Sequence, residues 1–317
     1  MKVLLLGWSE IGVRRVLPAC LALGVECIDV ASRSRPVRLP AGVRGVVFDA
    51  YETALAASKA DLVWISTLNQ LHAPLADAAL KAGYHVIIDK PATLALADTQ
   101  ALVATAERRR RLIAEATVYA FHPQIEAIRR VFVEAGAPPT RITAQFGYPP
   151  LDPANFRWRA AAGGGVLWDL GPYAVSVGRI FFGTAAARLH ACWGSVAGDE
   201  VPTSLSLLAR YPGDRTLVGH FDMRAEYVNR LELTGPGAAL SLERAFTTAP
   251  DRETCLATRI GGRPGERRVP AADAFAGFLG AVGRALADGD YAPFAAAMLA
   301  DALALEQVRR ACVSDPD

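Results

Sequence analysis

Three side chains, Lys90, Asp169 and Tyr173, have the types and spacing needed to handle the proton that accompanies hydride transfer at a C–O carbon. Burial near a strand end would lower the pKa of Lys90, and a neighbouring cation lowers the pKa of a tyrosine hydroxyl. Asp169 precedes Tyr173 by four residues, so both would share one face of a helix. We therefore expect Tyr173 to donate the proton to a nascent alkoxide, with Lys90 polarising the oxygen and tuning Tyr173. Asp169 would contact substrate hydroxyls or orient Lys90.

Residues 1–119 alternate short apolar runs with helical patterns, which is typical of a parallel sheet covered on both faces. Pro36 and Pro40 interrupt the segment 34–42, so this crossover is expected to be a loop. The expected strands are 3–6, 26–31, 45–48, 61–66, 85–88 and 112–118; the expected helices are 11–22, a short one from Glu52, 74–82 (closed by Gly83) and 97–110. This order predicts an α/β Rossmann domain, a doubly wound parallel sheet.

From residue 120 onward the pattern changes to strands without helices between most of them. A helix is expected at 123–136 and a final helical region at 272–313, interrupted near Gly289. The expected strands are 142–147, 188–196, 204–211, 216–223, 230–234 and 239–242, several of them separated by glycine-containing turns. We therefore predict an α+β domain with a large, mainly antiparallel sheet over 120–317, which binds substrate and mediates dimerisation.

The turn at 7–12 (GWSEIG) follows the first strand and opens the first helix. In the G-x-G-x-x-G fingerprint, glycines permit a tight turn and bring the pyrophosphate close to the helix N-terminus. Ser9 replaces the middle glycine here, and its small side chain allows approach and could donate a hydrogen bond to phosphate. The motif therefore predicts dinucleotide binding, and an ordinary tight turn is the alternative.

The residue about 20 positions beyond this motif normally distinguishes NAD from NADP. Ser32 stands there, followed by Arg33 and Arg35, whereas Asp29 lies too early, inside the expected strand. Arginine can bind a 2′-phosphate through two hydrogen bonds, and an acid would repel it. We therefore expect NADP(H) to be preferred and NAD(H) to remain usable, unless these arginines form only a solvated loop.

Polar residues follow several of the expected strands of the first domain. In a doubly wound sheet, ligands bind outside the carboxyl ends of the strands, so Gly7, Ser32, Asn69 and Lys90 should converge on one crevice. His72 begins a helix, so capping or packing is as good an interpretation as contact with the nicotinamide. The predicted cofactor-binding residues are Gly7, Ser9, Glu10, Ile11, Gly12, Ser32, Arg33, Thr67, Asn69, His72, Asp89, Lys90 and Pro91.

Further candidates for substrate binding lie in the second domain. His122 and Gln124 stand at the start of the helix that links the domains, where a structural role is the alternative. Tyr148 and Arg157 lie in the loop ahead of the glycines at 163–165 and could reach a substrate phosphate or sugar. The glycines themselves would let the backbone pass close to nicotinamide or substrate.

Two segments, 85–91 (HVIIDKP, preceded by STLNQLH at 66–72) and 163–173 (GGGVLWDLGPY), resemble the glucose–fructose oxidoreductase/inositol dehydrogenase (GFO/IDH/MocA) family. The resemblance runs over nearly the whole chain and implies a Rossmann domain followed by a C-terminal domain. Asp89 stands where the family usually has Glu, and Tyr173 where its commonest members have His.

The tyrosine resembles the branch that contains glucose–fructose oxidoreductase, dihydrodiol dehydrogenases and nucleotide-sugar 3-ketoreductases. Further similarity to the 3-ketoreductases lies at 14–19, 31–33 and 121–124. The resemblance implies NADPH-dependent reduction of a keto group on a dTDP-linked deoxysugar, and a homodimer or higher homo-oligomer. A dehydrogenase of a free sugar, cyclitol or dihydrodiol, an imine reductase, and a non-catalytic nucleotide-binding protein are the alternatives.

Composition narrows the remaining partners. The 317 residues carry a net charge of +2, which argues against nucleic acid or an acidic membrane as partner. The N-terminal apolar stretch ends at Gly7 without a signal-peptide cleavage pattern, and no run is long enough for a membrane span. The five cysteines are scattered, as in a reducing cytoplasm, and no His, Cys and carboxylate cluster has metal spacing. We therefore expect a cytoplasmic enzyme with a metal-free mechanism.

Overall fold

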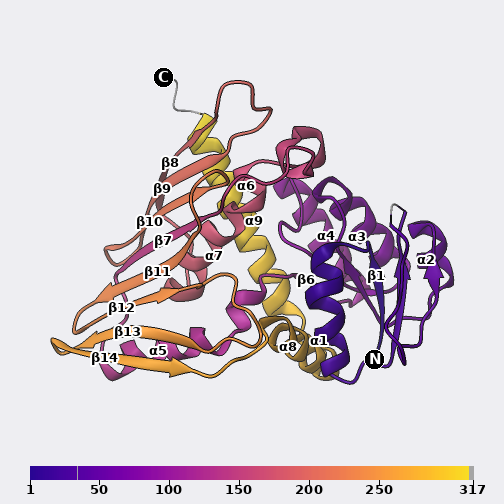
Figure 1. Cartoon of the computed structure of the whole chain (residues 1–317), viewed down its shortest axis with the longest axis horizontal. Helices are drawn as coiled ribbons and strands as arrows, with labels where there is room; N and C mark the ends of the chain where they lie inside the picture. The colour runs from indigo at the N-terminus through magenta and orange to yellow at the C-terminus, as the bar shows by residue number, and fades with distance from the viewer. Residues whose placement is uncertain (34, 314–317) are drawn as a thin grey trace. The chain divides into compact units, whose positions relative to one another are not determined.

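The computed structural model describes residues 1–33 and 35–313 and shows two compact units, which are described separately (Figure 1). Unit 1 comprises Met1–Ala116 and Phe278–Ala302, and unit 2 comprises Thr117–Gly277 and the chain from Leu303 onward. The helix α9, Ala292–Val313, therefore contributes its first half to unit 1 and its second half to unit 2. The predicted division of the chain into domains 1–119 and 120–317 stays a prediction.

Unit 1 is built on a six-stranded sheet in the order β3-β2-β1-β4-β5-β6, and every neighbouring pair is parallel. Its strands are β1 (Lys2–Leu6), β2 (Cys27–Ala31), β3 (Val47–Phe48), β4 (Leu62–Ile65), β5 (His85–Ile88) and β6 (Ile113–Glu115). All four residues of β4 are buried, because helices cover both faces of such a sheet. This is the doubly wound order that was expected from the alternating pattern.

The helices of unit 1 follow the predicted positions closely. A π-helical turn, Gly12–Val16, leads into α1 (Leu17–Ala22), and α2 (Tyr51–Ala57), α3 (His72–Lys81) and α4 (Leu96–Arg109) follow. The helix α8 (Ala274–Asp288) belongs to unit 1 from Phe278 onward. Residues 35–42 form neither helix nor strand, as the prolines predicted. The strand predicted at 112–118 was too long, because the chain leaves the sheet after Glu115 and turns into a 3-10 helix at Val118–Phe121.

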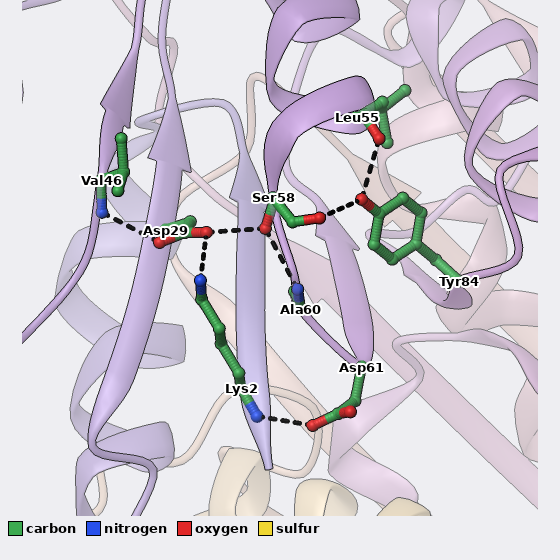
Figure 2. A network of polar contacts seen from close by, with 8 residues as sticks. All are labelled: Lys2, Asp29, Val46, Leu55, Ser58, Ala60, Asp61 and Tyr84. Atoms are coloured by element: carbon green, nitrogen blue, oxygen red, sulfur yellow. Dashed lines mark hydrogen bonds and ion pairs between the residues drawn. The ribbon is translucent and has the colours of Figure 1, made fainter.

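A buried polar network ties the first strands of unit 1 together at Asp29 (Figure 2). Its carboxylate accepts hydrogen bonds from Ser58 Oγ at 2.6 Å and Val46 N at 2.9 Å, and pairs with Lys2 Nζ at 2.8 Å. Burial opposes ionisation of Asp29, but these partners together hold its pKa below the ordinary value. Asp29 is thus fully engaged within the sheet, in agreement with its predicted place inside a strand.

Unit 2 is built on an eight-stranded sheet in the order β14-β13-β12-β11-β7-β10-β9-β8 (Figure 1). Its strands are β7 (Arg141–Gly147), β8 (Arg188–Gly194), β9 (Ser204–Tyr211), β10 (Arg215–Asp222), β11 (Val228–Gly235), β12 (Ala238–Glu243), β13 (Thr254–Ile260) and β14 (Arg263–Val269). Only β7 and β10 pair in parallel, so the predicted mainly antiparallel sheet is confirmed. The β13–β14 hairpin was missed by the sequence analysis.

One face of this sheet packs against α5 (Pro123–Glu134) and α7 (Gly171–Phe182) (Figure 1). Leu205, Leu207 and Ala209 of β9 point into this core and are almost completely buried. The apolar alternation of these residues was compatible with either an intrachain core or a subunit interface. The structure shows that it forms part of the intrachain core. The other face exposes Leu208 and its cross-strand partner Val218, each 48% exposed.

Candidate active site

Gly7 occupies the tight turn that leaves β1. Its φ is +98°, and a Cβ atom there would lie 2.1 Å from the carbonyl oxygen of Ser66. Only glycine fits such a position. The next turn of chain opens the helix at Gly12, whose N–H donates to Ser9 Oγ at 2.8 Å. A close-passing backbone followed by a helix N-terminus suits a dinucleotide pyrophosphate, so the residues present fit that cofactor.

Ser9 connects this turn to the end of β5 through a chain of hydroxyl groups. Ser66 Oγ donates to Asp89 Oδ2 at 2.5 Å, so Ser9 is the donor in its own 2.5 Å bond to Ser66 Oγ. The proton of Ser9 is therefore used inside the protein in this structure. Its predicted contact with phosphate stays a prediction, whereas its links to Gly12 and Ser66 give it a second, structural role.

We expect the variant Ser9→Ala to lower the free energy of unfolding of the apo protein by about 1–2 kcal/mol, because it removes the bond to Gly12 and the link to Ser66. Urea unfolding monitored by tryptophan fluorescence measures this. Ser195→Ala, at an exposed serine outside the helices and strands, is the matched control and should change stability by less than ~0.5 kcal/mol. Unchanged stability in Ser9→Ala would show that the hydroxyl chain carries no stabilising energy.

Asp89 stands directly before Lys90 at the carboxyl end of β5. Its two carboxylate oxygens accept from Ser66 Oγ and, at 2.8 Å, from Trp64 Nε1. Desolvation raises the pKa of Asp89, and these two hydrogen bonds together with the nearby His72 and Lys90 oppose the rise. The carboxylate therefore anchors the strand end that presents Lys90, and its predicted contact with the cofactor stays a prediction.

The ring of His72 contacts the backbone that follows Lys90. The ring is completely buried; Nδ1 lies 2.7 Å from the carbonyl oxygen of Pro91, and Nε2 lies 3.3 Å from that of Thr67. Carbonyl oxygens only accept, so the shorter contact places the proton on Nδ1. Desolvation lowers the pKa of His72, which keeps the ring neutral. These contacts correspond to the packing alternative left open for His72.

Asn69 and Arg33 lie at the ends of two other strands. Asn69 starts a 3-10 turn after β4 and is 8% exposed. Arg33 follows β2, and its guanidinium pairs with Glu52 at 2.7 Å. Ser32 Oγ donates to the carbonyl oxygen of Arg35 and accepts from its N–H. Together with Gly7 and Lys90, these residues all follow carboxyl ends of parallel strands, as the spacing predicted.

Tyr173 lies in the first turn of α7 in unit 2. Its ring packs against Phe146 at 5.2 Å, Phe246 at 5.4 Å and Tyr119 at 5.8 Å between centroids. Tilted and edge-on aromatic contacts of this kind fix the plane of a ring. The cluster therefore determines where the Tyr173 hydroxyl points.

Asp169, the last residue of α6 (Val166–Asp169), is held by the two predicted substrate-binding residues of the preceding loop. Its Oδ1 accepts from Arg157 Nε at 2.8 Å, and its Oδ2 accepts from the Tyr148 hydroxyl at 2.5 Å. The charge of Asp169 raises the pKa of Arg157, and burial together with that same charge raises the pKa of Tyr148. Tyr148 therefore stays protonated, and Arg157 and Tyr148 together fix the position of the carboxylate.

The glycines ahead of α6 are needed for this arrangement. A Cβ atom on Gly164 would lie 2.4 Å from the carbonyl oxygen of Arg157, and Gly165 has a φ of +97°. The close backbone approach predicted for the glycine run is thus made to the Arg157 loop. Their predicted approach to nicotinamide or substrate stays a prediction.

His122 and Gln124 are buried in unit 2 at the start of α5. His122 Nδ1 accepts from the N–H of Gln124 as the helix N-cap, and Gln124 Nε2 donates to the carbonyl oxygen of Ala245 at 2.7 Å. Their exposed fractions are 2% and 0%. These contacts fit a structural role, which was the alternative for both residues. Substrate binding by either residue stays a prediction.

The described residues also bear on two other expectations. Among residues 1–33 and 35–313, no group of three or more His, Cys, Asp or Glu side chains is arranged to hold a metal ion. In that same part of the chain, no helix is long and apolar enough to cross a membrane.

Comparison with known families connects both units to one group of enzymes. Residues 3–117 match an oxidoreductase family model with an NAD-binding Rossmann fold, and residues 135–241 match the GFO/IDH/MocA C-terminal domain. The chain belongs to the GFO/IDH/MocA oxidoreductase family. The resemblance drawn from 85–91 and 163–173 is thereby confirmed, as are the fold class and the assignment as an oxidoreductase.

Several relatives with assigned activities act on sugars. The chain is 32% identical over 297 residues to a dTDP-3,4-didehydro-2,6-dideoxy-alpha-D-glucose 3-reductase of Streptomyces violaceoruber, covering 90% of this chain and 86% of the relative. It is 30% identical over 293 residues to D-xylose 1-dehydrogenase (NADP(+)) 2 of Haloferax volcanii, covering 90% and 89%. The crystal structure of a 3-ketoreductase from Actinomadura kijaniata, in complex with NADP and TDP-benzene, superposes with a TM-score of 0.91 at 27% identity over 98% of each chain.

Proposed function

We propose that this family member is an NADPH-dependent ketoreductase that reduces a keto group on a nucleotide-linked sugar, most specifically a dTDP-linked keto-deoxysugar. The observation that carries the proposal is the Tyr173 hydroxyl, held at the start of α7 by three aromatic rings one turn after a fixed Asp169 carboxylate. The 3-reductase relatives and the 3-ketoreductase with TDP-benzene support the nucleotide-linked substrate.

The nicotinamide, when bound, supplies the hydride for the carbonyl carbon. Tyr173 donates the proton that the new alkoxide needs, and Lys90 donates a hydrogen bond to the same oxygen and favours the phenolate that results. Asp169, paired with Arg157 and hydrogen-bonded to Tyr148, accepts from a substrate hydroxyl or orients Lys90. Thr67, Asn69 and Pro91, with the turn from Gly7 to Gly12 through Glu10 and Ile11, bind the cofactor.

The preference for NADPH rests on Arg33, which follows β2 where the adenosine ribose of a Rossmann cofactor lies. We further propose that the protein is a cytoplasmic homodimer or higher homo-oligomer that acts without a metal. The outer sheet face around Leu208 and Val218 offers an apolar contact for a second copy.

The decisive measurement is a titration of the purified protein with NADPH and with NADH, followed by protein fluorescence and the reduced nicotinamide band. We expect tight binding of NADPH and weaker binding of NADH. Binding of neither would mean that the interpretation of the turn at 7–12 is wrong. Turnover of a dTDP-linked 3-keto sugar should then exceed turnover of a free sugar.

A dehydrogenase of a free sugar is the second candidate, supported by the similarity to the D-xylose 1-dehydrogenase. A free aldose lacks the diphosphate and the base, so it needs no contacts beyond the sugar ring. NADP⁺-dependent oxidation of free aldoses, with no activity on nucleotide-linked keto sugars, would favour this candidate.

A further inference from the structure

Arg33 and Glu52 form an ion pair at the place where the cofactor ribose is expected. Arg33 Nη2 donates to both carboxylate oxygens of Glu52, at 2.7 and 2.8 Å, and the guanidinium carbon lies 4.7 Å from the centroid of the Tyr51 ring. The side chains are 50% and 72% exposed. A ligand can therefore reach both charges from solvent.

The two residues stand shortly after the ends of neighbouring strands, Glu52 in the first turn of α2. Arg33 follows β2, Glu52 follows β3 by four residues, and β2 and β3 pair in parallel. The N–H of Ser32 donates to the carbonyl oxygen of Phe48 at 3.1 Å, which ties the two strand ends together. The pair therefore has a fixed place at the edge of the sheet where ligands of doubly wound folds bind.

The charges of the pair have opposite effects on the two cofactors. A hydrogen bond from its own backbone and the contact with Arg33 hold the pKa of Glu52 below the ordinary value, so the carboxylate is ionised at neutral pH. The 2′-phosphate of NADP(H) would gain Arg33 but meet the charge of Glu52. The 2′-hydroxyl of NAD(H) would meet no repulsion and could donate to the carboxylate.

We propose that Glu52 is a specificity-determining residue, which accepts the ribose 2′-hydroxyl of NAD(H) and limits the preference that Arg33 gives to NADP(H). The inference rests on the proposed function, because it requires a nicotinamide dinucleotide at this edge. In this proposal, the opposite charges of Arg33 and Glu52 together determine the discrimination between NADP(H) and NAD(H). Two like charges about 5 Å apart near a protein surface weaken binding by roughly fivefold or more.

The variant Glu52→Gln tests this through binding constants of the apo protein, without turnover. We expect the Kd for NADPH to fall by about fivefold and the Kd for NADH to rise by about threefold, so that the ratio shifts at least tenfold. Raising the salt concentration should shrink the NADPH effect because the pair is exposed. Adenosine 2′,5′-bisphosphate and 5′-AMP, as probes of the adenosine end alone, should show the same opposite shifts.

Two controls keep the outcome clear. Glu26→Gln removes another exposed carboxylate of unit 1 that pairs with an arginine, Arg44, and should leave both binding constants unchanged. Arg33→Gln should weaken NADPH and spare NADH. If Glu52→Gln left the ratio of the two dissociation constants unchanged, or weakened NADPH binding, the inference would be overturned, even though binding by the wild type still supported the proposed function. If the wild type bound neither cofactor, the proposed function itself would be overturned.

Discussion

The variant Tyr173→Phe should lower kcat by about 100-fold or more while leaving the affinity for NADPH unchanged. The substitution removes the hydroxyl that we propose as proton donor and keeps the ring that packs against Phe146, Phe246 and Tyr119. The core of unit 2 should therefore stay intact. Steady-state kinetics with a keto-sugar nucleotide, together with cofactor titration, measure the two quantities.

Tyr119→Phe is the matched control for this experiment. Tyr119 belongs to the same aromatic cluster, and its hydroxyl bonds to Ser176 Oγ at 2.8 Å inside the protein. Its loss should reduce stability by about 1 kcal/mol and change kcat little. If Tyr173→Phe kept near-normal turnover, or if both variants lost turnover equally, Tyr173 would not be the proton donor.

The framework of the fold was predictable because local patterns dictate it. Continuous apolar runs such as 62–65 belong to parallel strands buried on both faces, and alternation such as 205–209 belongs to a sheet buried on one face. The β13–β14 hairpin was missed, although the turn Gly261-Gly262 is a hairpin signal. Charged and small residues on β14 hide the alternation of the hairpin, and the pairing of β13 with β12 supplies the stability that the local sequence lacks.

The sequence indicated which residues could belong to the candidate site, but it did not indicate which of them contact one another. Tyr148 and Arg157 were expected near substrate, but only the structure shows them on the same carboxylate, that of Asp169. Likewise, Ser9 and Asp89 were two separate departures from a family pattern, and the structure joins them through Ser66. Such links connect positions far apart in the chain, so no local spacing predicts them.

The variant Lys90→Met should also lower kcat by about 100-fold or more, because it removes the cation that we propose to polarise the substrate oxygen and to favour the phenolate of Tyr173. The pKa of Tyr173 should rise in this variant, so the limb of the kcat profile that reports the tyrosine should move to higher pH. Lys90→Arg, which keeps the charge, should retain the wild-type position of that limb. Lys59→Met, at an exposed lysine of unit 1, is the control and should leave both kcat and its pH profile unchanged.

The double variant Lys90→Met/Tyr173→Phe tests whether the two residues act on one oxygen. Once Tyr173 is absent, Lys90 has no phenolate to favour, so much of its contribution is already lost. The double variant should therefore lose little more than the poorer single variant, whereas independent contributions would multiply to about 10⁴-fold. Multiplication of the two effects would show that Lys90 and Tyr173 serve separate steps, and a wild-type pH profile in Lys90→Met would show that Lys90 does not tune Tyr173.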